Sequence, residues 1–258
     1  FGLVGFVYIT FNRSSEYMAN APQYDVVLVG AGLGSLVTAA LLAKNGFRVL
    51  VLEKNKQIGG CLQSFGLDGQ RIETAVHYMG GLGENQTLFQ LVDYLGIMDN
   101  LSLKRLDENC FDQIILGDQV YDLAQGHERF ADILSEAFPH QHRALTNYVR
   151  DMRSVCDHFP LYNMRVGSLE EKRAVSGLGL KERLESLIPD PLLRKVLTAN
   201  NMLYAGQYHR TPYYLHALIE NSYIESSWKF AGGSAQLAKL LQEVILRHGG
   251  EVKRNTDV

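Results

Sequence analysis

The chain has 258 residues, of which 46% are hydrophobic and 21% are charged, and its formal net charge is −3. This composition is typical of a globular protein with one large domain or two smaller ones, and the near-neutral charge gives no support for nucleic-acid binding. The three cysteines, Cys61, Cys110 and Cys156, are odd in number and far apart. They exclude a disulfide framework and a cysteine metal cluster, and they favour a reducing, cytoplasmic location.

The first residues do not share the pattern of the rest of the chain. Residues 1–11 are mostly apolar, but they fall short of the roughly 20 residues that a helix needs to span a bilayer. We expect the native protein to start at Met18 and residues 1–21 to form an extension outside the fold. The alternative is the remnant of a signal or anchor, which leaves a peripheral membrane contact open.

The strongest pattern begins at Tyr24. Val26–Val29 is a continuous apolar run, which predicts a parallel strand buried on both faces. A tight turn follows, built on three glycines: Gly30, Gly32 and Gly34. Residues 36–44 then have the spacing of a helix, which the Asn45-Gly46 pair ends.

A second apolar strand is predicted over residues 47–52, and it ends at Glu53, about twenty residues beyond the turn. This order of strand, glycine turn, helix, strand and acid is the fingerprint of a dinucleotide-binding βαβ unit. In such a unit the helix N-terminus faces the pyrophosphate, and the acid accepts hydrogen bonds from the ribose. Ser35 stands in place of the third glycine, where a small side chain still allows close packing. The alternative is an α/β unit without a nucleotide, with Glu53 as a solvated acid.

Beyond the second strand the sequence resembles one flavoprotein family. Residues 59–61 read Gly-Gly-Cys, and residues 66–73 predict a hairpin turned at Asp68-Gly69. His77-Tyr78 then leads into a glycine-rich loop. These motifs resemble the FAD-dependent phytoene desaturase, carotenoid isomerase and retinol saturase group, a branch of the glutathione-reductase-like flavoproteins. The Gly-Gly-Cys form is most similar to the retinol saturase branch.

Three positions depart from that family: Ile72, Glu73 and Ala75 replace the usual Phe, Asp and Gly. The resemblance implies an α/β fold, in which a Rossmann-like FAD-binding domain with a parallel sheet and helices is interrupted by a mixed α+β substrate domain. The FAD-binding residues implied by the family's motifs are Gly30, Ala31, Gly32, Gly34, Ser35, Glu53, Lys54, Gly59, Gly60, Cys61 and Val258.

The resemblance also implies an FAD-dependent oxidoreductase that acts on the carbon–carbon double bonds of an apolar polyene. Hydride transfer at flavin N5 would serve saturation, desaturation or isomerisation alike. The partners would be an apolar small-molecule substrate of the retinoid or carotenoid kind and an unidentified electron donor or acceptor.

Three residues are candidates for the catalytic face: His77, Tyr78 and His216. A packing role is the alternative for each, as a buried His–Tyr pair or, for His216 and Tyr214, as part of a helix face. Glu73 is either a polar contact beside the flavin or a surface charge on the hairpin. Cys61 invites redox or covalent-flavin chemistry, although a small buried thiol is the commoner outcome.

The expected domain boundaries are 22–95 and 228–258 for the two parts of the FAD-binding domain and 96–227 for the inserted substrate domain. Helices are predicted over residues 87–95, 127–138, 141–159, 181–187, 191–202, 211–220 and 235–248, with a hairpin turned at Gly117-Asp118. Residues 167–179 are polar and contain glycines, which predicts a mobile loop.

The resemblance covers residues 24–258, roughly the first half of a family member, so we expect an N-terminal fragment. Two functions from other classes stay open. A flavin amine oxidase would share the cofactor domain but would need an aromatic cage, for which Trp228 and scattered tyrosines are available. A prenyl-protein binder of the Rab GDP-dissociation-inhibitor type would share the fold without a flavin, which the intact fingerprint with Glu53 disfavours.

Overall fold

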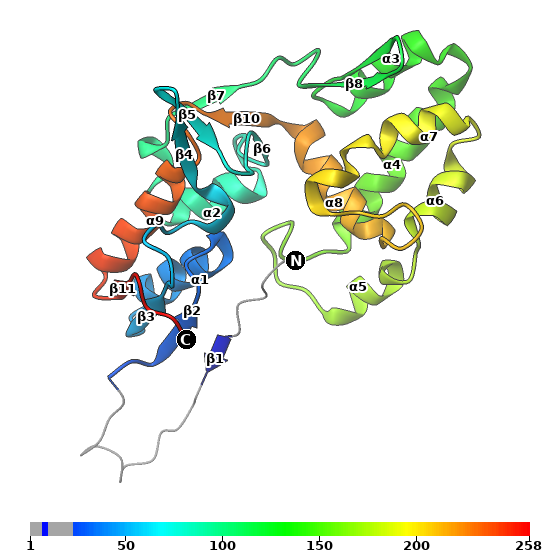
Figure 1. Ribbon diagram of the computed structural model, residues 1–258. Coiled ribbons are helices and arrows are strands. Elements are labelled where there is room, and N and C mark those ends of the chain that lie inside the picture. Colours follow the sequence, from blue (N-terminus) through cyan, green and yellow to red (C-terminus); the bar gives the residue numbers. More distant parts are fainter. Residues whose placement is uncertain (1–6, 10–22) are drawn as a thin grey trace. The chain divides into compact units, whose positions relative to one another are not determined.

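The computed structural model describes residues 7–9 and 23–258, and it divides into two compact units. Among these residues, the first unit comprises 7–9, 23–78, 91–104 and 229–258, and the second comprises 79–90 and 105–228. The glycine fingerprint lies in the first unit, which the second unit interrupts in sequence (Figure 1). Compared with the predicted boundaries, residues 79–90 and Trp228 belong to the second unit, and residues 96–104 belong to the first.

The first unit is built on a four-stranded sheet with the order β1-β2-β3-β11. β2 (Val26–Val29) and β3 (Val49–Leu52) run parallel, and β11 (Glu251–Lys253) pairs parallel with the other edge of β3. β1 (Val7–Ile9) pairs antiparallel with β2. These three residues therefore depart from the prediction that residues 1–21 lie outside the fold, and the others of that segment lie outside the described residues.

Two helices of the first unit pack against each other: α1 (Leu33–Lys44) and α9 (Ala235–Arg247). The buried face of α1 is made mostly of alanines, and small side chains let the neighbouring helix approach closely. The buried face of α9 supplies larger side chains, Leu237, Leu241, Val244 and Ile245 among them. Each such side chain contributes about 1.5–3 kcal/mol when it is fully buried.

β2 is less buried than its sequence predicts. Val26 and Leu28 are buried, but Val29 is 41% exposed. Val29 is the last residue of the strand, directly before Gly30 of the glycine turn. The prediction of a strand buried on both faces is therefore wrong for its last residue.

A short helix and a hairpin follow β3: η2 (Gly60–Leu62), β4 (Ser64–Leu67) and β5 (Gln70–Glu73). The hairpin turns at Asp68 and Gly69, which have φ values of 48° and 76°. Positive φ at both central residues is what an Asp-Gly turn between two strands requires, so the predicted turn is confirmed. The next short elements along the chain are β6 (Met79–Gly80), α2 (Thr87–Tyr94), η3 (Met98–Asn100) and β7 (Leu103–Arg105).

The longer segment of the second unit, residues 105–228, begins with a hairpin and continues as helices. The hairpin strands are β8 (Asp112–Leu116) and β9 (Gln119–Leu123), and they turn at the predicted Gly117-Asp118. The helical elements are α3 (His127–Ala137), η4 (Pro139–Gln141), α4 (His142–Asp157), α5 (Leu169–Ser176), α6 (Leu180–Leu187), α7 (Pro191–Leu197), η5 (Ala199–Tyr204) and α8 (Tyr213–Glu225). α4 packs on α3 and α8, and α6 also contacts α8.

Two predictions for this region are wrong. Residues 169–176 form α5 instead of a mobile loop, because Ser168 and Glu171 make a capping box that satisfies the helix N-terminus. Residues 191–202 do not form one helix, since α7 ends at Leu197 and the chain continues as the 3₁₀ helix η5. β10 (Ser227–Phe230), which lies between β6 and β7 in a three-stranded sheet, was not predicted at all.

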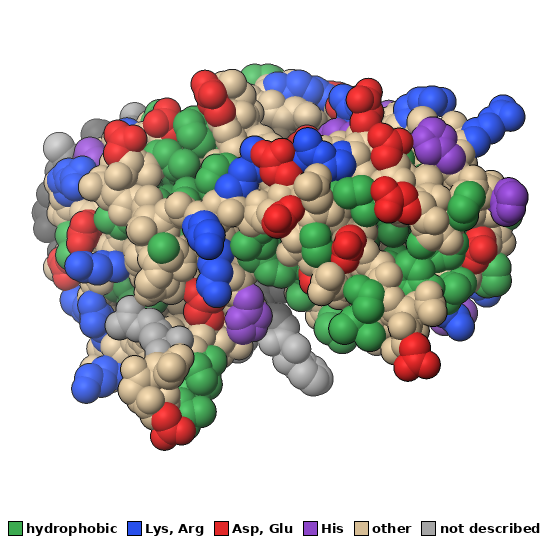
Figure 2. Space-filling model, turned by 90° about the horizontal axis from the view of Figure 1, so that it is seen from above, with side chains coloured by type: hydrophobic (Ala, Val, Ile, Leu, Met, Phe, Trp, Pro, Cys, Tyr) green, Lys and Arg blue, Asp and Glu red, His purple; other side chains and the backbone are tan. Residues whose placement is uncertain are grey.

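No helix in the described part of the chain is long and apolar enough to cross a membrane. Figure 2 shows acidic and basic side chains interspersed on the face in view. This mixed surface agrees with the small net charge of −3.

Candidate functional site

The turn between β2 and α1 is open above its glycines. A Cβ added at Gly30, Gly32 or Gly34 would meet no heavy atom within 4 Å. α1 starts directly after Gly32, with no side-chain cap and no acid in its first turn. The first N–H groups of a helix have no partner inside the helix, and the helix dipole is positive there. The turn therefore offers an uncovered site for an anion such as a pyrophosphate.

Glu53 is buried at the end of β3, with only 6% of its surface exposed. Its Oε2 accepts a hydrogen bond from the Ala31 amide at 2.7 Å. Its Oε1 accepts two more, from the backbone and side-chain nitrogens of Asn55, both at 2.9 Å. A carboxylate has about four acceptor positions, so about one is left for a ribose hydroxyl. Glu53 thus fits the ribose role through one hydrogen bond, and it also ties β3 to the glycine turn.

The Gly59-Gly60 pair lies directly against the glycine turn. The Gly59 amide donates to the carbonyl of Ala31 at 2.7 Å, and Gly59 forms a parallel bridge with Gly32. Both glycines have positive φ, 108° and 56°. A Cβ on Gly60 would stand 3.2 Å from the Cα of Gly32. Because these glycines have no side chains, the Gly59-Gly60 backbone can pack directly on the backbone of Ala31 and Gly32. The same lack of side chains would also let a cofactor come close.

Replacing Gly60 by alanine should lower the free energy of unfolding by about 1–3 kcal/mol, because a side chain there meets both a left-handed backbone and the Gly32 backbone. Gly46→Ala is the matched control, since Gly46 also has positive φ but open space around it. Denaturant melts of the two variants check this. Equal losses would show that the contact with Gly32 contributes nothing.

The other predicted cofactor residues have varied surroundings. Ser35 is half-buried in the first turn of α1, and Lys54 is exposed. Cys61 is a free, exposed thiol, so the interpretation as a small buried thiol is wrong. The Gly59-Gly60 backbone that precedes it is held against the turn, which leaves the Cys61 side chain at the surface. Val258 is 78% exposed.

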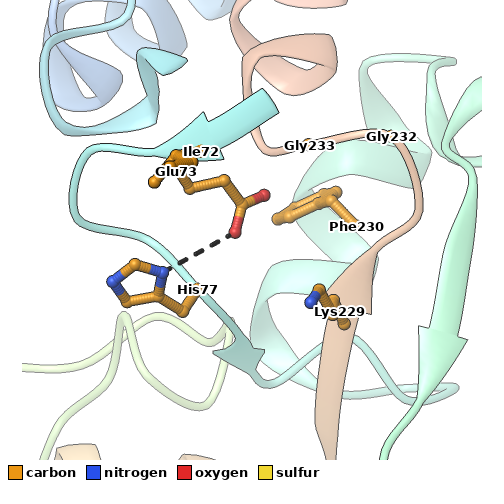
Figure 3. A pocket seen from close by; sticks show the side chains of 7 residues that line it. All are labelled: Ile72, Glu73, His77, Lys229, Phe230, Gly232 and Gly233. Atoms are coloured by element: carbon orange, nitrogen blue, oxygen red, sulfur yellow. Dashed lines mark ion pairs between the residues drawn. The ribbon is translucent and has the colours of Figure 1, made fainter. Parts of the chain in front are cut away.

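A pocket with a volume of about 400 Å³ lies in the first unit, between β5 and the segment before α9. Its lining residues are Ile72, Glu73, His77, Lys229, Phe230, Gly232 and Gly233. Figure 3 shows the Glu73 carboxylate pointing between the His77 ring and the strand that carries Phe230. Sequence reasoning found Glu73 and His77, but it missed Lys229 and Phe230, since they come from a strand that was not predicted.

The pocket changes the interpretation of two candidates. The Glu73 side chain is only 10% exposed and Oε1 accepts a hydrogen bond from the Ser234 amide at 2.9 Å, so Glu73 is not a solvated hairpin charge. The His77 side chain is 64% exposed, and its Nδ1 lies 3.9 Å from Oε2 of Glu73. The buried His–Tyr pair is therefore wrong for His77, while its neighbour Tyr78 is half-buried.

His216 lies in the core of the second unit and is fully buried on α8. Its Nε2 is 2.8 Å from the hydroxyl of Tyr148, and its Nδ1 is 3.1 Å from the hydroxyl of Tyr204. Burial lowers the pKa of His216 from 6.5 to about 3, so the ring is neutral at physiological pH. Its neighbour Tyr214 stacks on Phe159 with ring centroids 5.1 Å apart. These contacts give His216 and Tyr214 the packing role that was the alternative to catalysis.

The segment that carries the glycine fingerprint matches a family model. Residues 28–95 match the NAD(P)-binding Rossmann-like domain. The all-trans-retinol 13,14-reductase of Danio rerio is 30% identical over 248 residues, which cover 88% of this chain and 40% of that protein. Prolycopene isomerase 2 of an Oncidium hybrid cultivar is 27% identical over 168 residues, which cover 65% of this chain and 28% of that protein.

The retinol reductases and carotenoid isomerases that this chain is similar to match the group that its motifs resemble. The motifs that carried the resemblance, from the glycine turn to His77-Tyr78, all fall inside the matched region. The chain spans about 40% of the length of the retinol reductases that it matches.

Solved structures share the fold. An oxidoreductase from Methanosarcina mazei superimposes with a TM-score of 0.60 at 20% identity, over 89% of this chain and 50% of that one. The cyclohexylamine oxidase of Brevibacterium oxydans gives 0.57 at 21% identity, over 90% and 51% of the two chains. A Rab GDI from Plasmodium falciparum gives 0.51 at 14%, over 89% and 57%. At these identities the likeness establishes a Rossmann-like α/β fold and does not select among the three functions.

Proposed function

We propose that this chain is the dinucleotide-binding part of an FAD-dependent oxidoreductase that acts on the carbon–carbon double bonds of an apolar polyene. The observation that carries the proposal is the open glycine turn beside the buried carboxylate of Glu53, in a relative of retinol reductases and carotenoid isomerases. A bound flavin would supply hydride transfer at its N5 atom, so the protein needs no acid–base pair of its own for the redox step.

The residues of this chain would bind and orient the cofactor. The first N–H groups of α1 would hold the pyrophosphate, and the remaining acceptor position of Glu53 would take a ribose hydroxyl. Gly59 and Gly60 would keep the turn in the conformation that exposes these N–H groups, because they are hydrogen-bonded and packed against it. All these residues lie in the first unit.

An apolar polyene agrees with the names of two relatives, all-trans-retinol 13,14-reductase and prolycopene isomerase. Such substrates partition into membranes, so a peripheral membrane contact belongs to the same proposal. Saturation, desaturation and isomerisation would place the same demands on cofactor binding, and they would differ in whether the flavin gives a hydride, takes one, or undergoes no net change.

The direct test is an absorption spectrum of the purified protein after incubation with FAD and removal of the free cofactor. Retained flavin absorbance, with changes on adding a retinoid or carotenoid, would support the proposal. A flavin that responds only to a primary amine would favour an amine oxidase. A protein that stays colourless would favour the flavin-free binder.

Replacing Glu53 by alanine should weaken FAD binding by about 1–3 kcal/mol, because the cofactor loses a charged hydrogen-bond acceptor and Ala31 and Asn55 lose theirs. Isothermal titration with FAD measures this. Glu243→Ala on the exposed face of α9 is the control, since its pair with Lys239 is exposed and contributes little. Unchanged FAD affinity in Glu53→Ala would remove Glu53 from the site.

A further inference from the structure

Helix α9 has an unusual N-terminus. Its N-cap residue is Ser234, yet the serine side chain makes no cap hydrogen bond. Instead Ser234 Oγ donates to the carbonyl of Leu62 at 3.2 Å. The third position of the helix, where a capping box has Glu or Gln, is the buried Leu237, and the first turn contains no acid. The cap that this helix needs is therefore not supplied by its own residues.

Glu73 supplies it from β5. Its Oε1 accepts a hydrogen bond from the Ser234 amide at 2.9 Å, which is the bond that a capping-box glutamate would make. The side chain is nine-tenths buried, and it places a negative charge at the positive end of a 13-residue helix. Figure 3 shows the same carboxylate reaching from β5 toward the segment that carries Gly232 and Gly233.

The contact continues from Ser234 to the glycine turn. Ser234 bonds Leu62, the Leu62 amide donates to the carbonyl of Gly59 at 3.0 Å, and the Gly59 amide donates to Ala31 at 2.7 Å. A Cβ on Gly59 would stand 3.1 Å from the Cβ of Ala238, so α9 also packs directly on this glycine. Every residue of this series lies in the first unit.

We infer that Glu73 is a positioning residue for the dinucleotide site. Its carboxylate fixes the position of the N-terminus of α9. The hydrogen bonds through Ser234, Leu62 and Gly59 then hold in place the turn that would bind the pyrophosphate. Glu73 touches no reacting atom in this role. The inference rests on the proposed function for its ligand, although the series of hydrogen bonds exists without one.

The test compares ADP with FAD. ADP would contact only the glycine turn and Glu53. FAD would make the same contacts and would also place its flavin in the protein. Glu73→Leu removes the acceptor and keeps the size of the side chain, so it should weaken both ligands by a similar factor of about 10–100. Glu73→Gln keeps an acceptor oxygen for the Ser234 amide, and its affinities should stay within about threefold of the original protein. Calorimetric titration of both ligands gives these four constants.

Glu243→Leu is the matched control, because it makes the same change on the exposed side of the same helix. A thermal melt of each variant shows whether it is folded at the titration temperature. Amide hydrogen exchange without ligand gives a second readout: Glu73→Leu should speed exchange at Ser234, Leu62 and Gly59, and Glu73→Gln should not.

Three outcomes would overturn the inference. Weakened FAD with unchanged ADP in Glu73→Leu would make Glu73 a direct contact of the flavin half. Unchanged affinity for both ligands would show that the hydrogen bonds from Glu73 to Gly59 do not influence the conformation of the glycine turn. Unchanged exchange at Leu62 and Gly59 would show the same without any ligand. If the original protein binds neither ADP nor FAD, the proposed function fails, and the exchange result still decides the role of Glu73.

Discussion

Replacing Gly80 by alanine should lower the free energy of unfolding by at least about 3 kcal/mol, which is the upper range for an inserted methyl group. Gly80 lies in β6 against the end of α8, and an added Cβ would stand 2.5 Å from both the carbonyl carbon and the oxygen of Ser222. These are backbone atoms, so no side-chain rotation can relieve the clash. The Gly81 amide also donates to the same carbonyl, at 3.2 Å, and it would be displaced with it.

The control for this variant is Gly177→Ala. Gly177 follows α5 with an ordinary φ of −84°, and an added Cβ would meet nothing within 4 Å. Its melting temperature should stay close to that of the original protein, while Gly80→Ala should melt about 6–12 °C lower. Equal melting temperatures for the two variants would show that β6 moves away from α8 without cost.

The elements that were predicted correctly are those whose signals are local. Asp68-Gly69 and Gly117-Asp118 fix two hairpins, because a two-residue turn with positive φ leaves few other conformations. The register between the glycine turn and Glu53 is equally local, since one helix and two short strands set it. That is why the glycine turn and the acid beside it could be located from the sequence.

The parts that were missed depend on distant partners. β10 pairs with β6, which lies about 150 residues earlier in the chain, and neither short strand has an alternating pattern that would reveal it. Because β10 was not predicted, its residues Lys229 and Phe230 were not predicted to line the pocket. The cap of α9 by Glu73 is likewise a contact across the chain. By contrast, the Ser168–Glu171 capping box of α5 is a local pattern that the sequence already contains. The loop prediction relied on the surrounding glycines instead, and so it missed this helix start.

The contribution of Glu220 to the stability of the second unit should fall as the pH rises from about 4.5 to 8. Glu220 is 4% exposed on α8, and its Oε1 is buried without a hydrogen-bond partner among the described residues. Burial raises the pKa of this carboxyl from 4.5 to about 8. Between these values the unfolded chain has released the proton and the folded chain still holds it, so raising the pH favours unfolding. The loss should reach roughly 2–5 kcal/mol above pH 8.

His216, one turn earlier on α8, affects the stability of the second unit at acidic pH. Burial lowers its pKa from 6.5 to about 3. Between these two pH values His216 is protonated in the unfolded chain and neutral in the folded chain. Stability should therefore fall as the pH drops from 6.5 toward 3. Between about pH 4.5 and 6.5 the two slopes oppose each other. The melting temperature should thus be nearly level in that range and lower on both sides of it.

Glu220→Gln separates the two groups. Glutamine resembles the protonated carboxyl in size and cannot ionise, so the alkaline fall should disappear while the acid fall caused by His216 remains. At pH 8 the variant should be more stable than the original protein, although the buried amide needs partners of its own. The measurement is chemical unfolding from pH 4 to 9 for both proteins, followed by helical circular dichroism. An alkaline fall of unchanged size in Glu220→Gln would show that Glu220 ionises without penalty, and its carboxylate would then have to be in contact with water.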